Sequence, residues 1–156
     1  MSVVHGQPSA PMADDPDDYR PNSSWRLAFD PEARVDMTVI YESIGVGDRI
    51  PRHVHDVDEV ILVEGGSARV FVDGVETEAE TGTTVFIPAG TIHGTVNAGE
   101  VPVEVRAMFA TTTLRMDLVE RNPMPGTEGQ PPMTSVYYVR EDRFEVVGPS
   151  PFASTD

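Results

Sequence analysis

The sequence contains no cysteine and no lysine. Without cysteine, the chain can form no disulfide scaffold, no thiolate nucleophile and no cysteine-ligated metal site. All 11 basic residues are arginine, and 26 acidic residues outnumber them, so the formal net charge is −15. Such an acidic surface repels nucleic acid and anionic lipid, and we therefore expect neither as a partner.

Long apolar runs are also missing. No run approaches the roughly 20 apolar residues that cross a bilayer, so we expect no membrane partner. The first residues, "MSVVHGQPSAPMADD", lack the basic start and apolar stretch of a secretory signal, and a cytoplasmic location is the default expectation. With 156 residues, the chain is long enough for one domain with a single core.

What the sequence does contain is a series of short apolar runs separated by proline and glycine. Residues 35–44 alternate with a period of two, which places Met37 and Tyr41 on one expected face. Asp73-Gly74 is a strong signal for a two-residue hairpin. The pattern predicts an all-β sandwich or barrel.

Two segments depart from this strand pattern. Residues 111–122 form the one window that could be helical, and the signal is ambiguous. Residues 122–133 are rich in proline and glycine and are expected to form a loop, which could act as a lid or pack against a partner subunit.

The chain divides into three parts by composition. Residues 1–24 are rich in proline, aspartate and serine and poor in branched apolar side chains, so we expect a flexible N-terminal tail. Residues 25–147 are expected to form the barrel domain, and residues 148–156 a C-terminal tail.

Histidine is scarce, with four in the chain, yet two of them lie one residue apart in "PRHVHDVDEVILVEGG". On a strand, side chains two residues apart point the same way, with Cα atoms about 6.5–7 Å apart. His53, His55 and Glu59 are therefore expected to share one face with the apolar residues that follow. Polar groups aimed into an apolar interior are costly unless something satisfies them, and a metal ion would do so.

His93 lies in a second strand-rich stretch, "GTTVFIPAGTIHGTVN". Pro88 and Gly90 form a turn before it, which places His93 near the start of a strand. Three of the four histidines thus lie in two stretches that one hairpin separates, a compact arrangement for three metal ligands.

The spacing of these residues resembles the two signature motifs of the cupin superfamily. The first motif has the pattern Gly47-x5-His53-x-His55-x3-Glu59-x6-Gly66, and the second has Gly82-x5-Pro88-x-Gly90-x2-His93-x3-Asn97. Every fixed position of both patterns is occupied, and the linker between them is short, as in small bacterial cupins.

This resemblance implies a double-stranded β-helix, or jelly-roll barrel, with a metal site near its wider mouth. His53, His55, Glu59 and His93 would be the ligands of one divalent transition metal; we favour Fe(II), with Mn, Ni, Cu and Zn as alternatives. The competing interpretation is a barrel in which hydrogen bonds satisfy these side chains without a metal. The resemblance also implies a homodimer.

The expected function is a metal-dependent enzyme that acts on a small organic molecule. A non-haem Fe(II) dioxygenase is the favoured form. A redox-neutral isomerase, cyclase or lyase is the alternative, in which Glu59 could be a catalytic base as well as a ligand. A non-catalytic cupin that binds a small ligand is a further alternative.

Further residues are candidates to line the substrate pocket: Arg69, Arg106, Tyr41 and Met108. Each arginine could anchor a substrate carboxylate, or it could face solvent on a half-exposed sheet. Tyr41 and Met108 could line the barrel or pack in its core. Asn97 could hydrogen-bond to a ligand histidine, or it could cap the end of a strand.

Overall fold

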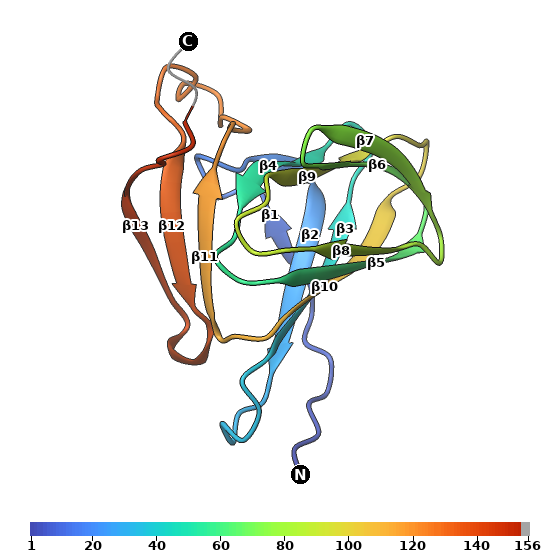
Figure 1. Cartoon of the computed structure of the whole chain (residues 1–156), viewed down its shortest axis with the longest axis vertical. Coiled ribbons are helices and arrows are strands. Elements are labelled where there is room, and N and C mark those ends of the chain that lie inside the picture. Colours follow the sequence, from blue (N-terminus) through green and yellow to red (C-terminus); the bar gives the residue numbers. More distant parts are fainter. Residues whose placement is uncertain (154–156) are drawn as a thin grey trace.

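The computed structural model describes residues 1–153, which form two antiparallel β-sheets (Figure 1). The strands of the first sheet, in spatial order, are β1 (Ala10–Met12), β2 (Arg20–Phe29), β3 (Thr38–Ile44), β10 (Val103–Phe109), β5 (Glu59–Gly65) and β8 (Thr84–Ile87). Those of the second are β13 (Arg143–Pro149), β12 (Met133–Tyr138), β11 (Thr113–Leu118), β4 (Arg49–Val54), β9 (His93–Asn97), β6 (Ser67–Val72) and β7 (Val75–Glu80). One short 3-10 turn, η1 (Val139–Glu141), joins β12 to β13.

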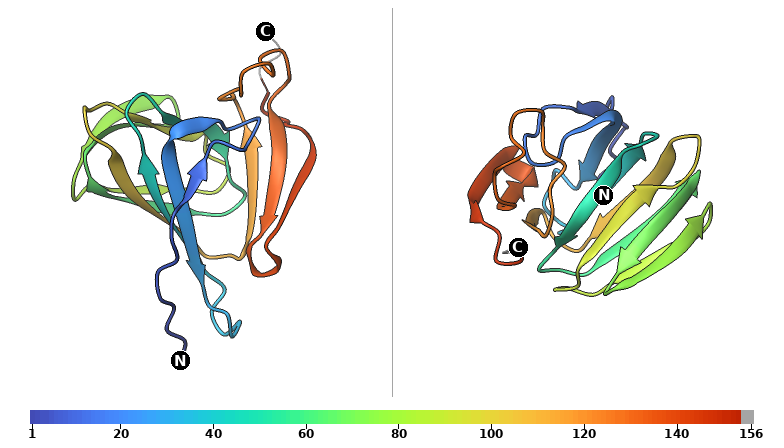
Figure 2. Two further views of the ribbon diagram at one scale, coloured as in Figure 1. Left: turned by 180° about the vertical axis from the view of Figure 1, so that it is seen from behind. Right: turned by 90° about the horizontal axis from the view of Figure 1, so that it is seen from above.

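The two sheets face each other across one apolar core (Figure 2). Strands β5 and β10 alternate as half-buried strands should, so that Ile61 and Val63 are buried beside Val105 and Ala107. The predicted all-β jelly-roll barrel is confirmed. No helix in the described part of the chain is long and apolar enough to cross a membrane.

The predicted hairpin at Asp73-Gly74 joins β6 to β7. Both residues have positive φ, 48° for Asp73 and 84° for Gly74, as a two-residue turn between twisted strands requires. This hairpin separates the two histidine-bearing stretches along the chain, and β6 pairs with β9 on the edge opposite to β7.

The face of β3 that points to the core is opposite to the predicted one. Thr38 and Ile44 are fully buried, whereas Met37 is 42% exposed and precedes the strand. The residues between 35 and 44 are apolar on both faces, so alternation alone does not decide which face is buried. The ring of Tyr41 lies on the outer face, against the Arg26 guanidinium.

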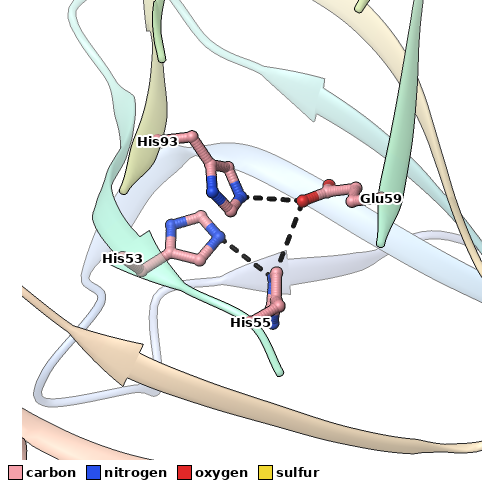
Figure 3. A group of neighbouring side chains, drawn as sticks. All are labelled: His53, His55, Glu59 and His93. Carbon is pink, nitrogen blue, oxygen red and sulfur yellow. Dashed lines mark hydrogen bonds and ion pairs between the residues drawn. The ribbon is translucent and has the colours of Figure 1, made fainter. Parts of the chain in front are cut away.

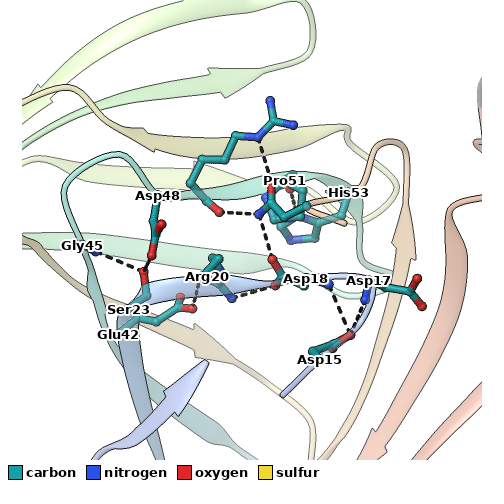
Figure 4. Close-up of polar contacts among 12 residues, drawn as sticks. Asp15, Asp17, Asp18, Arg20, Ser23, Glu42, Gly45, Asp48, Pro51 and His53 are labelled. Carbon is teal, nitrogen blue, oxygen red and sulfur yellow. Dashed lines mark hydrogen bonds and ion pairs between the residues drawn. The ribbon is translucent and has the colours of Figure 1, made fainter. Parts of the chain in front are cut away.

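The expected flexible tail over residues 1–24 is wrong from residue 10 onward. Ala10–Met12 and Arg20–Phe29 are strands, and the proposed boundary between residues 24 and 25 falls inside β2. Polar contacts, rather than apolar burial, hold this segment in place. The buried Arg20 guanidinium donates to Asp18 and Glu42, at 2.8 and 2.5 Å (Figure 4).

Arg121 holds the same segment from the other side. The residue is 8% exposed, and its guanidinium donates to the Asp17 carboxylate and to the carbonyl oxygen of Pro16. It also donates to the carbonyl oxygens of Thr127 and Gln130. One buried arginine therefore ties the N-terminal segment to the 122–133 loop, which forms the loop expected from its proline and glycine content.

Two further boundaries differ from the sequence-based expectation. The window that could be helical, residues 111–122, contains strand β11, because Thr113–Leu118 pairs with both β12 and β4. The barrel domain was expected to end at residue 147, but β13 continues to Pro149 and the Ser150 N–H donates to the Pro132 carbonyl. Residues 154–156 of the expected C-terminal tail lie outside the described residues.

Candidate metal centre

Four buried side chains meet between the two sheets (Figure 3). His53 comes from β4 and His93 from β9, where the two are paired directly across the strands. His55 follows the end of β4, and Glu59 opens β5 in the opposite sheet. Each residue contributes one potential ligand atom, and all of these atoms lie within 4.8 Å of one another.

The route that the chain takes between these residues differs from the expected single strand. β4 ends at Val54 and β5 begins at Glu59, and the residues between them cross from one sheet to the other. Glu59 therefore faces the histidines from across the barrel instead of sharing a strand face with them. The expected alternation does hold inside β5, where Glu59 is buried with the apolar residues of that strand.

Backbone carbonyls fix the orientation of all three imidazole rings. The Nδ1 atom of His53 lies 2.7 Å from the Pro51 oxygen, that of His55 2.5 Å from the Arg115 oxygen, and that of His93 2.8 Å from the Thr91 oxygen. A carbonyl oxygen only accepts, so each Nδ1 carries the proton in the neutral ring. The Nε2 lone pairs are thus left for the centre of the cluster.

The inner atoms of the cluster lack satisfactory partners among themselves. The Nε2 atoms of His53 and His55 lie 3.1 Å apart, although neither has a proton to donate in this tautomer. Glu59 Oε2 lies 2.7 Å from His93 Nε2, and both atoms are buried without a hydrogen bond of good geometry. A metal ion would satisfy all four atoms at once, so the donor set fits a divalent transition metal better than hydrogen bonds alone.

The local electrostatics keep two of the rings neutral. Burial, reinforced by the neighbouring His93 and His55 rings, lowers the pKa of His53 well below its usual value. Burial also lowers the pKa of His55. Burial acts in the same direction on His93, but the Glu59 carboxylate beside its Nε2 outweighs burial and raises the His93 pKa. His53 and His55 therefore need to lose no proton to become ligands at neutral pH.

One wall of the cluster is aromatic. Phe109 is 3% exposed, pairs with Glu59 across β10 and β5, and lies edge-on to the His55 ring with centroids 5.0 Å apart. An apolar neighbour of this kind excludes water and strengthens electrostatic interactions at the ligands.

Asn97 does not touch the ligand histidines. Its side-chain amide donates to the Ile44 and Val101 carbonyls, and its Oδ1 accepts from the Gly99 N–H. Of the two roles considered for Asn97, the structure shows the strand-end cap, and the expected hydrogen bond to a ligand histidine is wrong.

The four candidates for the substrate pocket lie on outer faces of the sheets. Arg69 has a side chain that is 50% exposed, 3.9 Å from Glu76. Arg106 and Met108 occupy the positions of β10 that alternate with its buried residues, and Arg106 pairs with Glu64 and contacts the Tyr41 ring. These residues are not brought together with the four buried ligands.

Sequence reasoning missed the polar and aromatic residues that do face inward. Glu42 pairs with Val105 on one side and Trp25 on the other, so all three project from the inner face of the first sheet. The Trp25 ring meets Tyr137 of the second sheet, with centroids 6.0 Å apart. Glu42 lies on the same face of β3 as the buried Thr38 and Ile44. The sequence did not reveal that this face points inward, and Glu42 was therefore missed.

Arg20 belongs with this inward group. Its positive charge contributes to lowering the pKa of His53, and its Nε is buried without a hydrogen-bond partner. The residue was missed because it lies in the segment expected to be a flexible tail.

Comparison with known proteins supports the fold. A model of the cupin domain matches residues 40–110, a range that contains all four ligand residues. A search of curated proteins gave no match. Among solved structures, a cupin sugar phosphate isomerase from Silicibacter pomeroyi is 18% identical with a TM-score of 0.63, and the match covers 87% of this chain and 82% of that one.

Two further structures match shorter parts of the chain. An RmlC-like cupin from Shewanella frigidimarina is 21% identical, with a TM-score of 0.50 over 57% of this chain and 76% of that one. Salicylate 1,2-dioxygenase from Pseudoaminobacter salicylatoxidans is 14% identical, with a TM-score of 0.52 over 58% of this chain and 25% of that one. At these identities the similarity concerns the fold. The jelly-roll barrel, the two occupied motifs and the match to the cupin model together identify residues 40–110 of this chain as a cupin domain.

Proposed function

We propose that the protein is a metal-dependent enzyme that transforms a small organic molecule inside the barrel. The observation that carries this proposal is the convergence of three imidazole Nε2 atoms and one carboxylate within 4.8 Å, with every Nδ1 directed to a backbone carbonyl. Such a ligand set is oriented before the ion arrives, as effective metal sites require. Four protein ligands also leave open positions on an octahedral ion.

The favoured form of this proposal is a non-haem Fe(II) dioxygenase. When bound, Fe(II) would supply the redox chemistry that dioxygen requires. The chain itself contributes the buried ligands and the aromatic wall at Phe109, which keeps water away from His55. It also contributes Trp25 and Tyr137, whose partly exposed rings offer apolar contacts on the inward side.

A redox-neutral isomerase, cyclase or lyase is the second candidate, and one observation favours it. Glu42 and Glu59 project from the same inner face of the first sheet, because Glu42 pairs with Val105 and Glu59 pairs with Phe109. If Glu59 is held as a ligand, Glu42 remains as a second inward carboxylate that could move a proton. Arg20 donates to Glu42 at 2.5 Å and would orient that carboxylate.

The test is the metal content of the protein, purified without a histidine tag. We expect about one first-row transition metal per chain, and loss of that metal in the His53→Ala and His93→Ala variants. His5→Ala is the matched control, because His5 is the remaining histidine and is exposed. A parent protein without stoichiometric metal would refute the proposal.

Oxygen consumption then separates the two candidates. Iron-loaded protein is mixed with phenolic, diketone and carboxylate compounds while dissolved dioxygen is recorded. Substrate-dependent oxygen uptake that His93→Ala abolishes supports the dioxygenase. Conversion of a substrate at equal rates with and without dioxygen, together with its loss in Glu42→Gln, supports the redox-neutral enzyme.

A further inference from the structure

The inward faces of β2 and β3 carry mostly apolar side chains. Leu27 pairs with Ile40, and both are half-buried on the same face of the sheet as Trp25 and Glu42. Across the barrel, the Tyr137 ring of the second sheet meets the Trp25 ring. Such walls favour a ligand with an apolar body, because each polar group that lacks a partner there costs free energy.

Glu42 is the polar exception on this face. Its side chain is 10% exposed, and its Oε1 accepts a hydrogen bond from the Arg20 guanidinium at 2.5 Å. Within residues 1–153, Oε2 of the same carboxylate makes no hydrogen bond. One oxygen is therefore held in place, and the other is left as an acceptor among apolar neighbours.

A chain of buried polar side chains fixes the position of Glu42 (Figure 4). Arg20 is 4% exposed and also donates to Asp18 Oδ2 at 2.8 Å, and the Asn122 amide donates to Asp18 Oδ1 at 3.0 Å. The positive charge of Arg20 contributes to lowering the pKa of His53, so this network lies beside the metal centre. Arg20 is thus a positioning residue, which orients Glu42 between the two sheets.

We propose that Glu42 determines the substrate specificity of the centre, because its Oε2 accepts a hydrogen bond from a hydroxyl group of a small, uncharged aromatic substrate. This inference rests on the proposed function and names the substrate class of the same site. The aromatic body lies against the half-buried Trp25 and Tyr137 rings. A carboxylate in place of the hydroxyl would meet a second acceptor of like charge.

A polyol fits the same space less well. Each of its hydroxyl groups needs a partner, and the neighbouring Leu27 and Ile40 side chains offer none. The Tyr137 hydroxyl already donates to Asp142 at 2.6 Å. One free acceptor among apolar side chains therefore matches a hydroxy-aromatic compound better than a sugar.

The test compares three ligands of one shape: p-cresol, which has a hydroxyl group, p-methylanisole, in which a methyl group replaces its proton, and p-toluate, which has a carboxylate. Trp25 is the one tryptophan of the chain, so quenching of its emission reports binding at this site. The protein is used as purified and without dioxygen, so that no oxidation occurs. We expect p-cresol to bind roughly tenfold or more tightly than either of the other two compounds.

Glu42→Gln then tests the residue itself. Glutamine keeps the shape of the side chain, but it has no charge and adds an amide donor. The preference for p-cresol over p-toluate should fall by roughly tenfold. Glu104→Gln is the matched control, because Glu104 lies on the outer face of the same sheet and accepts from Ser43. Its preference should equal that of the wild type, and circular dichroism checks that both variants are folded.

The ligand series on the wild type decides the proposal even if Glu42→Gln does not fold. Equal affinity for p-cresol and p-toluate, or for p-cresol and p-methylanisole, overturns it. So does the absence of quenching by all three compounds, displacement of p-cresol by glucose at equal concentration, or an unchanged preference in folded Glu42→Gln protein.

The outcome is separable from that of the proposed function, because metal content is measured independently. A protein without metal that still prefers p-cresol refutes the enzyme and leaves the role of Glu42 in specificity. A metal-containing protein without that preference refutes the role of Glu42 and leaves the enzyme.

Discussion

His53 and His93 lie directly opposite each other in the antiparallel pair of β4 and β9, with ring centroids 4.2 Å apart. Two of the four candidate ligands are therefore positioned by sheet register rather than by a loop. A register is an all-or-none property, because a shift of one residue would turn each side chain to the opposite face. Substitutions that disturb the sheets should therefore weaken metal binding more than substitutions in surface loops.

Gly66→Ala should destabilise the protein strongly. Gly66 has a φ of +78°, and a Cβ placed there would lie 2.6 Å from the backbone oxygen of Pro102. Backbone strain and overpacking together should lower the free energy of unfolding by about 2–5 kcal/mol. Gly82→Ala is the matched control, because φ is +94° but a Cβ there would meet open space. Urea unfolding should show a loss of about 1–2 kcal/mol for Gly82→Ala, and equal losses in the two variants would contradict the steric argument.

Asn97→Ala should lower stability without removing the metal. The substitution leaves the Ile44 and Val101 carbonyls and the Gly99 N–H without their side-chain partner. The cost should be about 1–3 kcal/mol in urea unfolding. Metal content per folded chain should match the wild type, because the side chain does not contact a ligand histidine. Loss of metal at unchanged stability would show that Asn97 acts on the centre after all.

Arg121→Met should release the N-terminal segment. The substitution removes the ion pair with Asp17 and the bonds to Pro16, Thr127 and Gln130, and it leaves Asp17 without its partner. Breaking a buried pair in this way costs about 3–5 kcal/mol. Amide hydrogen exchange should accelerate at Asp17 and in residues 127–130. Arg34→Met, at a side chain that is 63% exposed, should leave exchange there unchanged.

The stability of the metal-free protein should decrease in acid because of His53. Its pKa is lower in the folded state than the ordinary value of 6.5, so below pH 6.5 the unfolded chain binds a proton that the folded chain resists. The contribution of His53 to the free energy of unfolding is therefore complete above pH 6.5. It is lost as the pH falls, by up to about 1.4 kcal/mol per pH unit.

His53→Gln tests this directly, because glutamine does not titrate. With a chelator present, the difference in unfolding free energy between wild type and variant should be constant above pH 6.5. As the pH falls from 6.5 toward 5, the wild type should lose unfolding free energy relative to the His53→Gln variant. Parallel curves over the whole range would show that His53 does not titrate differently in the two states.

The candidate ligands could be found from the sequence because three of them are histidines, of which the chain has four, and all of them lie at fixed spacings. The motifs that contain His53, His55, Glu59 and His93 identify the residues, whatever route the chain takes between them. The route itself could not be predicted, because the crossing from β4 to β5 leaves the spacing unchanged. Strand periodicity alone suggested one continuous strand.

The inner face of the barrel was harder to predict for a different reason. The apolar residues of 35–44 occur on both faces of β3, so the burial of Ile44 rather than Tyr41 depends on the neighbouring strands. The ordered N-terminal segment depends on contacts between Arg20 and Glu42 and between Asp17 and Arg121, which are distant in sequence. The amino-acid composition of the segment shows that these residues are polar, but it does not show which distant residues they contact.

The division of the ligands between the two sheets has a mechanical consequence. An ion held by β4 and β9 on one side and by Glu59 on the other would act as a cross-link between the layers of the barrel. Unfolding would then have to break that cross-link, so the midpoint of thermal unfolding would rise with the concentration of the correct metal. Heat resistance would thus report occupancy of the centre even before a substrate is known.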